Sequence, residues 1–151
     1  MTDEPIRVVL VDDHGMVRRG LRGYLGLFPD IEVVGEASDG GAAIEELRRL
    51  DGEGRLPDVV LMDLAMEPVD GVEATERAKR LWPDIEVVAV TSFVEEARVH
   101  GALAAGASGY VIKDASPEEI AVAIRAAHRG EIHLDAAVAR RLMGTIRPAA
   151  P

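Results

Sequence analysis

The chain has 151 residues and a mass of 16.2 kDa, which is an ordinary size for one domain. Apolar residues make up 48% of it and aromatic residues only 3%, so aliphatic side chains must fill the core. The lack of cysteine in the sequence excludes a disulfide scaffold, a thiolate metal site and a catalytic thiol. A net charge of −10 opposes nonspecific binding of this chain to nucleic acid or anionic lipid.

Five short apolar segments that are rich in Val and Ile recur along the chain and predict β-strands. They cover residues 6–11, 31–37, 59–62, 85–90 and 110–112. Most of them lack alternation between polar and apolar residues, which is typical of parallel strands buried on both faces. Helical patterns separate them, and this alternation of strand and helix predicts an α/β fold with a parallel sheet.

Five helices are predicted between and after these strands. They cover residues near 16–27, 41–50, 72–81, 95–105 and 116–130. Several boundaries carry their own signals: Pro83 closes the third helix, Gly106 suits the end of the fourth, and Ser116 with Pro117 suits the start of the fifth. A weaker sixth helix, over residues 135–143, lies outside the repeat, and with the tail at 147–151 we interpret it as a linker.

Four of the five predicted strands stop at a reactive polar residue directly after the apolar segment. These residues are Asp12 and Asp13, Asp63, Thr91 and Lys113. Each one alone would be explained as a helix cap, a turn residue or a solvated lysine. Function in an open parallel sheet collects at the carboxyl ends of its strands, so the four ends together predict one shared site.

The three carboxylates of Asp12, Asp13 and Asp63 would crowd negative charge into that site. Like charges ~4 Å apart repel each other by about 4 kcal/mol at an effective dielectric constant of roughly 20. A hard divalent cation relieves the repulsion, and oxygen ligands favour Mg²⁺ or Mn²⁺ over zinc. With a lysine and a hydroxyl beside it, such a centre predicts phosphoryl transfer, in which one carboxylate is the nucleophile.

At this point residues 6 to about 130 resemble the receiver domain of two-component response regulators. The motifs are Val11-Asp12-Asp13-His14, Leu61-Met62-Asp63-Leu64, Ala89-Val90-Thr91-Ser92 and Gly109-Tyr110-Val111-Ile112-Lys113-Asp114. The wording of Arg19-Gly20-Leu21, Ala105-Gly106-Ala107-Ser108-Gly109-Tyr110 and Lys113-Asp114-Ala115-Ser116 is similar to the NarL/FixJ subfamily, whose output domain is LuxR-type. The resemblance implies a flavodoxin-like, doubly wound (βα)5 sandwich with strand order 2-1-3-4-5, followed by a short C-terminal linker helix.

The resemblance also implies a role for each acidic residue. Asp63 matches the phosphoacceptor, which receives a phosphoryl group from a histidine kinase. Asp13 matches a direct Mg²⁺ ligand, and Asp12 matches a ligand that acts chiefly through water. Asp63 itself and the backbone carbonyl of Ala65 complete the implied ligand set for Mg²⁺ or Mn²⁺.

Three further residues match the family's switch. Thr91 matches the hydroxyl that moves toward the phosphoryl group, and Lys113 matches the cation that pairs with that group. Tyr110 matches the aromatic residue that swings inward behind the threonine. The bistable element would be the face formed by the fourth and fifth strands and the helices that follow them.

Two positions depart from the family pattern. Glu67 takes the place of a proline that often follows the acceptor, although Gly71 keeps the loop length. Asp114 stands where many receivers have a cis-proline after the lysine, and a cis bond to a residue other than proline would cost roughly 2.5–4 kcal/mol. The sequence leaves open the shape of the loop at Glu67 and the geometry of the Lys113–Asp114 bond.

These features predict a receiver domain over residues 1–130, with a linker helix and tail over residues 131–151 that lead toward an absent helix-turn-helix domain. We expect a sensor histidine kinase as partner and DNA binding only through the absent domain. A homodimer is expected on phosphorylation, through either the first and fifth helices or the face of the fourth helix, fifth strand and fifth helix. No apolar segment reaches the ~18 residues that span a bilayer, and no signal peptide begins the chain, so a cytoplasmic protein without a membrane partner is expected.

The same residues argue against two other functions. A phosphatase of the haloacid dehalogenase type needs a second aspartate two residues after the nucleophile, where this chain has Ala65. A stand-alone or phosphorylation-independent adaptor would not require the full set of acids with Thr91 and Lys113. The chain is therefore not expected to be an enzyme, except toward its own phosphorylation and dephosphorylation. The four histidines lack a metal-binding spacing, and His14 is interpreted as a residue at the start of a helix.

Overall fold

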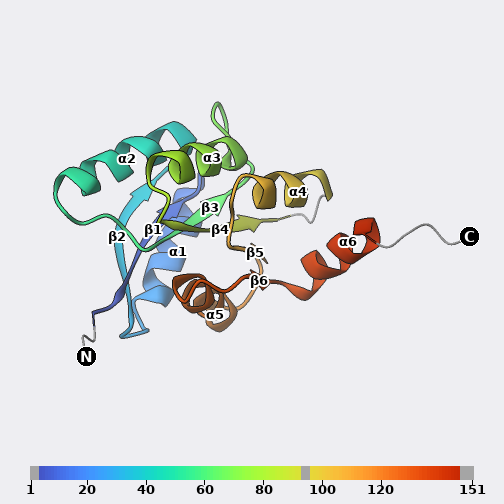
Figure 1. The fold of residues 1–151 in the computed structure, drawn as a ribbon. Helices are drawn as coiled ribbons and strands as arrows, with labels where there is room; N and C mark the ends of the chain where they lie inside the picture. Colours follow the sequence, from blue (N-terminus) through green and yellow to red (C-terminus); the bar gives the residue numbers. More distant parts are fainter. Residues whose placement is uncertain (1–3, 93–95, 147–151) are drawn as a thin grey trace, which may run out of the picture.

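The computed structural model describes residues 4–92 and 96–146. A parallel sheet with the strand order β2-β1-β3-β4-β5-β6 forms its centre. Figure 1 shows α2, α3 and α4 over one face of the sheet and α1 and α5 over the other. The flavodoxin-like fold and the order of its first five strands are confirmed.

The observed elements lie close to the predicted ones. The strands are β1 (Ile6–Val11), β2 (Ile31–Ala37), β3 (Val59–Asp63), β4 (Glu86–Thr91), β5 (Gly109–Ile112) and β6 (His133–Leu134). The helices are α1 (Gly15–Leu25), α2 (Gly40–Gly52), α3 (Gly71–Leu81), α4 (Glu96–Ala104), α5 (Pro117–His128) and α6 (Ala136–Ile146). The predicted start of the fourth helix at residue 95 and the tail at 147–151 fall outside the described residues.

The apolar strands are buried on both faces, as the lack of alternation predicts. Val8 and Leu10 of β1 pack into the cluster beneath α1 and α5, together with Ile124 of α5. Val9 and Val11 of the same strand pack into the opposite cluster, beneath α2 and α3. Both faces of the central strands need apolar side chains, and the buried polar residues of these strands, Asp63 and Thr91, are the last residues of β3 and β4.

The short strand β6 was not predicted from the sequence. It extends the sheet beyond β5, since the backbone N–H of His133 donates to Ser108 O at 3.2 Å and that of Asp135 donates to Tyr110 O at 3.0 Å. Two half-buried residues are too few for a hydrophobic period to be recognised. The strand therefore brings the chain that follows α5 back to the edge of the sheet.

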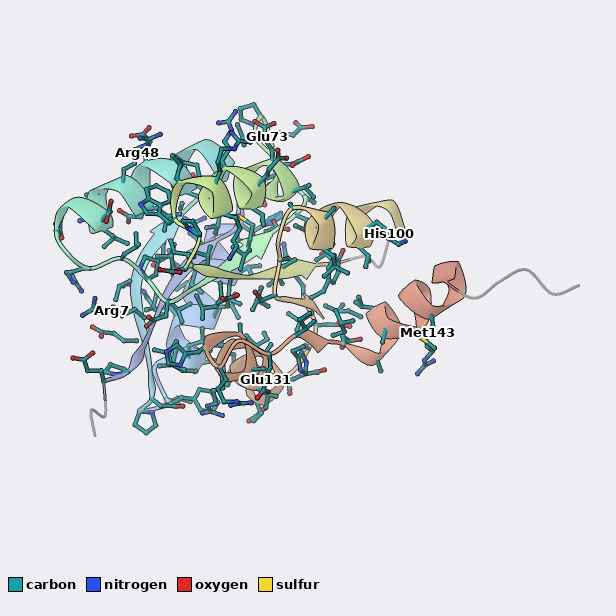
Figure 2. The ribbon with its side chains drawn as sticks, viewed as in Figure 1. Arg7, Arg48, Glu73, His100, Glu131 and Met143 are labelled. Atoms are coloured by element: carbon teal, nitrogen blue, oxygen red, sulfur yellow. The ribbon has the colours of Figure 1, made fainter. Side chains whose placement is uncertain are left out.

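Helix α6 starts from this edge and leads away from the sheet (Figure 1). Val138 in its first turn is fully buried, in the same apolar cluster as Leu64 and Tyr110. Met143 on the same helix is exposed (Figure 2). One end of α6 is thus packed against the domain, and the other end extends beyond it.

Gly71 allows the first turn of α3 to lie against the end of β3. A Cβ atom at this position would lie 2.1 Å from the carbonyl oxygen of Asp63 and 2.7 Å from Cα of Leu64. Both neighbours are backbone atoms, so no side-chain rotation relieves the overlap. The glycine eight residues after Asp63 is therefore required for the loop and the acceptor strand to pack together.

Replacement of Gly71 by alanine should lower the free energy of unfolding by about 2–3 kcal/mol, the upper range for overpacked sites. The control is Gly23→Ala on α1, where a Cβ atom would meet nothing within 4 Å. That variant should gain about 0.5–1 kcal/mol, because alanine favours a helix interior over glycine. Urea unfolding of both variants measures the difference, and equal stabilities would contradict the close packing at Gly71.

Candidate functional site

The carboxyl ends of four adjacent strands bring the predicted polar residues together. Asp12 follows β1, Asp63 ends β3, Thr91 ends β4 and Lys113 follows β5. Asp12, Asp63 and Thr91 are 3%, 1% and 1% exposed, so the polar groups lie in the protein and not on its surface. Asp13, in contrast, is exposed at the rim.

Lys113 links the two buried carboxylates. Its Nζ atom lies 3.0 Å from Asp12 Oδ2 and 3.2 Å from Asp63 Oδ2. Burial disfavours the charged amine, but the hydrogen bond to Asp12 and the attraction of Asp63 outweigh it and raise the pKa of Lys113 above its usual value. The lysine is therefore a charged donor directed at both acids.

The environment of Asp63 disfavours its ionised form. Burial raises the pKa of the carboxyl group above its usual value, and the negative charge of Asp12 adds to the rise. The backbone N–H of Ala65, which donates to Asp63 Oδ1 at 3.1 Å, and the ammonium of Lys113 offset only part of this effect. A cation that approached the site would thus relieve an unfavourable charge.

Asp12, Asp13, His14 and Asp63 form the acidic cluster, and one ligand atom from each lies within 4.8 Å of the others. Three carboxylates this close together match the oxygen ligands that Mg²⁺ prefers. His14 is the residue before α1, and its Nδ1 lies 3.1 Å from Asp12 Oδ1 and 2.9 Å from Asp13 Oδ1. The predicted role of His14 at a helix start is confirmed, and the carboxylate set is suited to a hard divalent ion.

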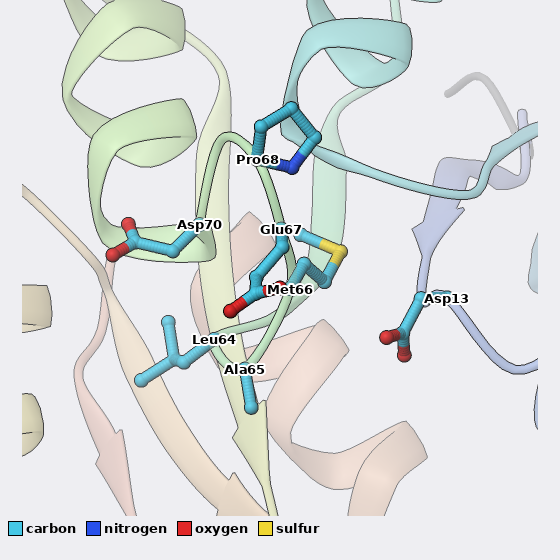
Figure 3. Close-up of a pocket in the computed structure, with 7 residues that line it drawn as sticks. All are labelled: Asp13, Leu64, Ala65, Met66, Glu67, Pro68 and Asp70. Atoms are coloured by element: carbon cyan, nitrogen blue, oxygen red, sulfur yellow. The ribbon is translucent and has the colours of Figure 1, made fainter.

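A cavity of about 540 Å³ opens beside this cluster (Figure 3). Asp13 lines one side of it, and the loop between β3 and α3 lines the other. The loop residues that line it are Leu64, Ala65, Met66, Glu67, Pro68 and Asp70. Ala65 and Asp13 therefore border the same space, next to the buried end of β3.

The two departures from the family pattern are both visible in the structure. Glu67 is exposed and lines this cavity, so it adds a negative charge near Asp13. The peptide bond between Glu67 and Pro68 is cis. Among residues 4–92 and 96–146 no other cis bond occurs, so the bond from Lys113 to Asp114 is trans.

Thr91 and Tyr110 lie on the same face of the sheet. Ala89 pairs with Tyr110 and Thr91 pairs with Ile112, so the side chains of Thr91 and Tyr110 both face the α4 side. The backbone N–H of Lys113 donates to Thr91 O at 2.7 Å, which ties the end of β5 to the end of β4. Tyr110 is fully buried in the cluster that contains Leu64 and Val138.

Arg18 also reaches the site, although sequence reasoning did not select it. Its guanidinium group donates to the backbone carbonyl of Asp12 and to Glu36 Oε1. The sequence held a partial signal, because residue 18 lies one helical turn after His14. The structure confirms this turn, since the backbone N–H of Arg18 donates to His14 O. Glu36 lies on β2, which the chain reaches only after α1, so the contact between Arg18 and Glu36 could not be predicted from local spacing.

The protein-family model for the response regulator receiver domain matches residues 8–125 of this sequence. The chain belongs to this family. It is a receiver domain of a two-component response regulator, a signalling protein whose relatives bind Mg²⁺ in an acidic pocket. In the described part of the chain, no helix is long and apolar enough to cross a membrane.

Similar proteins include the transcriptional regulatory protein LiaR of Bacillus subtilis, with 45% identity over 142 residues, 94% of this chain and 65% of that protein. The response regulator VraR of Staphylococcus aureus is 48% identical over 126 residues, 83% of this chain and 58% of that protein. The chain thus spans less than two thirds of the length of these curated relatives.

Two solved structures illustrate the similarity of fold. A LuxR-family response regulator from Aurantimonas sp. has a TM-score of 0.84 and 33% identity, covering 95% of this chain and 99% of that one. The receiver domain of a NarL regulator from Mycobacterium tuberculosis has a TM-score of 0.76 and 35% identity, covering 85% and 99%. The relationship to NarL- and LuxR-type regulators that the sequence motifs indicate is confirmed.

The raised pKa of Asp63 predicts how stability depends on pH. Because the pKa is higher in the folded than in the unfolded protein, ionisation favours unfolding, and this group's contribution falls as pH rises from about 4 toward the folded pKa. Asp63→Asn cannot ionise, so in EDTA it should be more stable than the parent protein near neutral pH, where the parent carboxylate is ionised at a cost.

The advantage of Asp63→Asn should disappear below about pH 4, where the parent carboxyl is protonated in both states. Urea unfolding at the two pH values measures it. The control is Asp84→Asn, which removes one negative charge at an exposed position. A gain for Asp63→Asn that is equal at both pH values would show that desolvation of the carboxylate is not its cause.

Proposed function

We propose that this receiver takes a phosphoryl group from a sensor histidine kinase onto Asp63. The observation that carries the proposal is a buried carboxylate in contact with Lys113 and beside the carboxylates of Asp12 and Asp13. The proposed ligands of Mg²⁺ or Mn²⁺ are Asp12, Asp13, Asp63 and the backbone carbonyl of Ala65. When bound, the ion supplies positive charge to the phosphoryl oxygens.

In the proposed reaction, an oxygen of Asp63 attacks the phosphorus atom of a phosphohistidine. The new P–O bond forms as the P–N bond breaks, and the imidazole nitrogen leaves with the bonding electrons and takes up a proton. Lys113, 3.2 Å from Asp63 Oδ2, can follow the charge onto the phosphoryl oxygens. Water later attacks the phosphorus atom, the P–O bond to Asp63 breaks, and inorganic phosphate leaves as the Asp63 carboxylate is regenerated. The chain thus acts only on its own phosphoryl group.

Thr91 and Tyr110 are the proposed switch. A phosphoryl group brings added charge and three acceptor oxygens to the end of β3, one strand away from Thr91 in the sheet. A hydroxyl that turns toward this group leaves space behind it on the α4 side of the sheet. Tyr110 lies on that side, so a change in its packing would carry the signal toward α4 and α6.

Intact mass after incubation with acetyl phosphate and Mg²⁺ tests the proposal. The parent protein should gain one phosphoryl group, and EDTA or Asp63→Ala should abolish the gain, because the nucleophile or the metal is then missing. Asp84→Asn, which removes an exposed carboxylate away from the site, should gain the group as the parent does.

An adduct of equal yield in Asp63→Ala would contradict Asp63 as the acceptor. If the parent protein gains no group, the phosphorylation-independent adaptor becomes the better interpretation. In that case Glu67→Pro is the next variant, because Glu67 adds negative charge to the cavity beside Asp13.

We also propose that residues 1–130 are the receiver proper and that residues 131–151 lead as a linker toward a helix-turn-helix domain that binds DNA. The outward direction of α6 supports this division (Figure 1). So does the greater length of LiaR, which is named as a transcriptional regulator. Solved structures that resemble this chain include dimers of RcsB bound to DNA. Such a regulator would act in the cytoplasm.

A homodimer is the proposed phosphorylated form, and α1 with α5 is its proposed interface. The α4 side of the sheet is partly covered by α6, whose Val138 is fully buried there. The surface of α1 and α5 presents exposed apolar side chains, namely Met16, Tyr24 and Val122. The covered face is therefore less available to a second copy than the α1–α5 face.

Sedimentation with and without Mg²⁺ and beryllofluoride, which mimics the phosphoryl group, measures the assembly. The parent protein should shift from monomer to dimer, and Val122→Asp should shift the dissociation constant at least tenfold higher, because a charge would then be buried in the interface. Leu81→Asp is the matched control, since Leu81 on α3 is 45% exposed and Val122 on α5 is 46% exposed. Equal dimerisation of the two variants would rule out α5 as the interface.

A further inference from the structure

Every polar atom of Asp12 has a partner in the structure. Its side-chain Oδ1 accepts from the backbone N–H of His14 at 2.8 Å, and its Oδ2 lies 3.0 Å from Lys113 Nζ. Its backbone N–H donates to Ala37 O at 3.1 Å. Its backbone carbonyl accepts from the guanidinium of Arg18. Four partners therefore hold Asp12: one on β2, one on α1, one just before α1 and one just after β5.

The hydrogen bond from Arg18 differs from the one between Asp12 N–H and Ala37 O because its donor is charged. That donor is also held in place by an ion pair. Arg18 Nε lies 3.1 Å from Glu36 Oε1, and Arg22 Nε lies 3.1 Å from Glu36 Oε2. Glu36 on β2 therefore bridges two arginines on successive turns of α1. Hydrogen bonds with a charged donor are about twice as strong as neutral ones, and the planar guanidinium can serve two acceptors at fixed angles.

The position of the carbonyl matters because only Asp12, Asp13 and His14 separate β1 from α1. Rotation about the Cα–C bond of Asp12 would turn its carbonyl and would swing Asp13, with its carboxylate, relative to Asp12. The bond from Arg18 opposes that rotation at the Asp12 carbonyl. Groups that orient metal ligands from outside the ligand set commonly change metal affinity by about 10–100-fold when they are removed.

We propose that Arg18, aligned by Glu36, is a positioning residue for the metal site: it fixes the Asp12 carbonyl and thereby the direction of the Asp13 carboxylate relative to that of Asp12. The inference rests on the proposed function, because it requires the site to bind Mg²⁺. Arg18 does not touch the ion or the phosphoryl group. It acts through the backbone, so its loss weakens Mg²⁺ binding without removing a ligand.

Calorimetric titration with Mg²⁺, with no phosphodonor present, tests the inference on Arg18→Gln and Arg22→Gln. Each variant loses one ion pair with Glu36, but only Arg18 bonds to Asp12. We expect the dissociation constant for Mg²⁺ to rise about tenfold in Arg18→Gln and to stay within about twofold of the parent value in Arg22→Gln. Arg18→Lys should also bind Mg²⁺ weakly, since one ammonium cannot replace the two-directional guanidinium.

The rate of phosphorylation by acetyl phosphate gives a second readout. Arg18→Gln should need a higher Mg²⁺ concentration for half-maximal rate, while its rate at saturating Mg²⁺ stays close to that of the parent. If Arg18 only stabilised the fold, Arg18→Gln would lower the free energy of unfolding, as Arg22→Gln does, and would leave the Mg²⁺ midpoint unchanged. Should Arg18→Gln fail to fold, Glu36→Gln removes the alignment of Arg18 and should shift the midpoint in the same direction.

The outcomes separate this inference from the proposed function. Failure of the parent protein to bind Mg²⁺ would contradict the proposed metal site. Normal Mg²⁺ binding by the parent, with equal dissociation constants in Arg18→Gln and Arg22→Gln, would overturn the role of Arg18 alone.

Discussion

The contact of Lys113 with Asp12 and Asp63 underlies the arrangement of the whole site. Two carboxylates buried at the edge of a sheet repel each other, and the ammonium of Lys113 between them offsets part of that repulsion. In the sheet, Lys113 lies two strands away from Asp63 and three strands away from Asp12, yet its long side chain reaches both. It therefore balances their charge and joins the ends of β1, β3 and β5 into one unit.

The same contact leaves an uncompensated negative charge at the site. Lys113 offsets only part of the cost of burying Asp63, whose pKa stays above its usual value. A bound cation would lower the free energy of this site. The proposed phosphoryl group would do so too, because its oxygens would offer Lys113 more acceptors than the carboxylate does. Because Lys113 is also bonded through its backbone to Thr91, a shift of the lysine is transmitted to β4.

Sequence patterns were sufficient for the sheet and for the buried polar residues at its edge. Residues such as Val8 to Val11 have to be apolar on both faces, so Asp12 after them is conspicuous even without a structure. Patterns failed where the cause is a contact between distant segments. The strand β6 exists because Gly109 and Tyr110 offer it an open edge, and Arg18 reaches Asp12 only because Glu36 on β2 aligns it. Neither relation leaves a local period in the chain.

The burial of Val138 has a consequence that runs opposite to the usual direction of signalling. Val138 shares one apolar cluster with Leu64, the residue after Asp63. Lifting α6 from the domain would open that cluster and loosen the packing behind the acceptor. Coupling between two sites is reciprocal in free energy, so if the proposed phosphorylation of Asp63 changes the packing of α6, a partner that binds α6 would change that phosphorylation by the same coupling energy. Under the proposed function, the C-terminal helix would thus be an input to the receiver as well as its output.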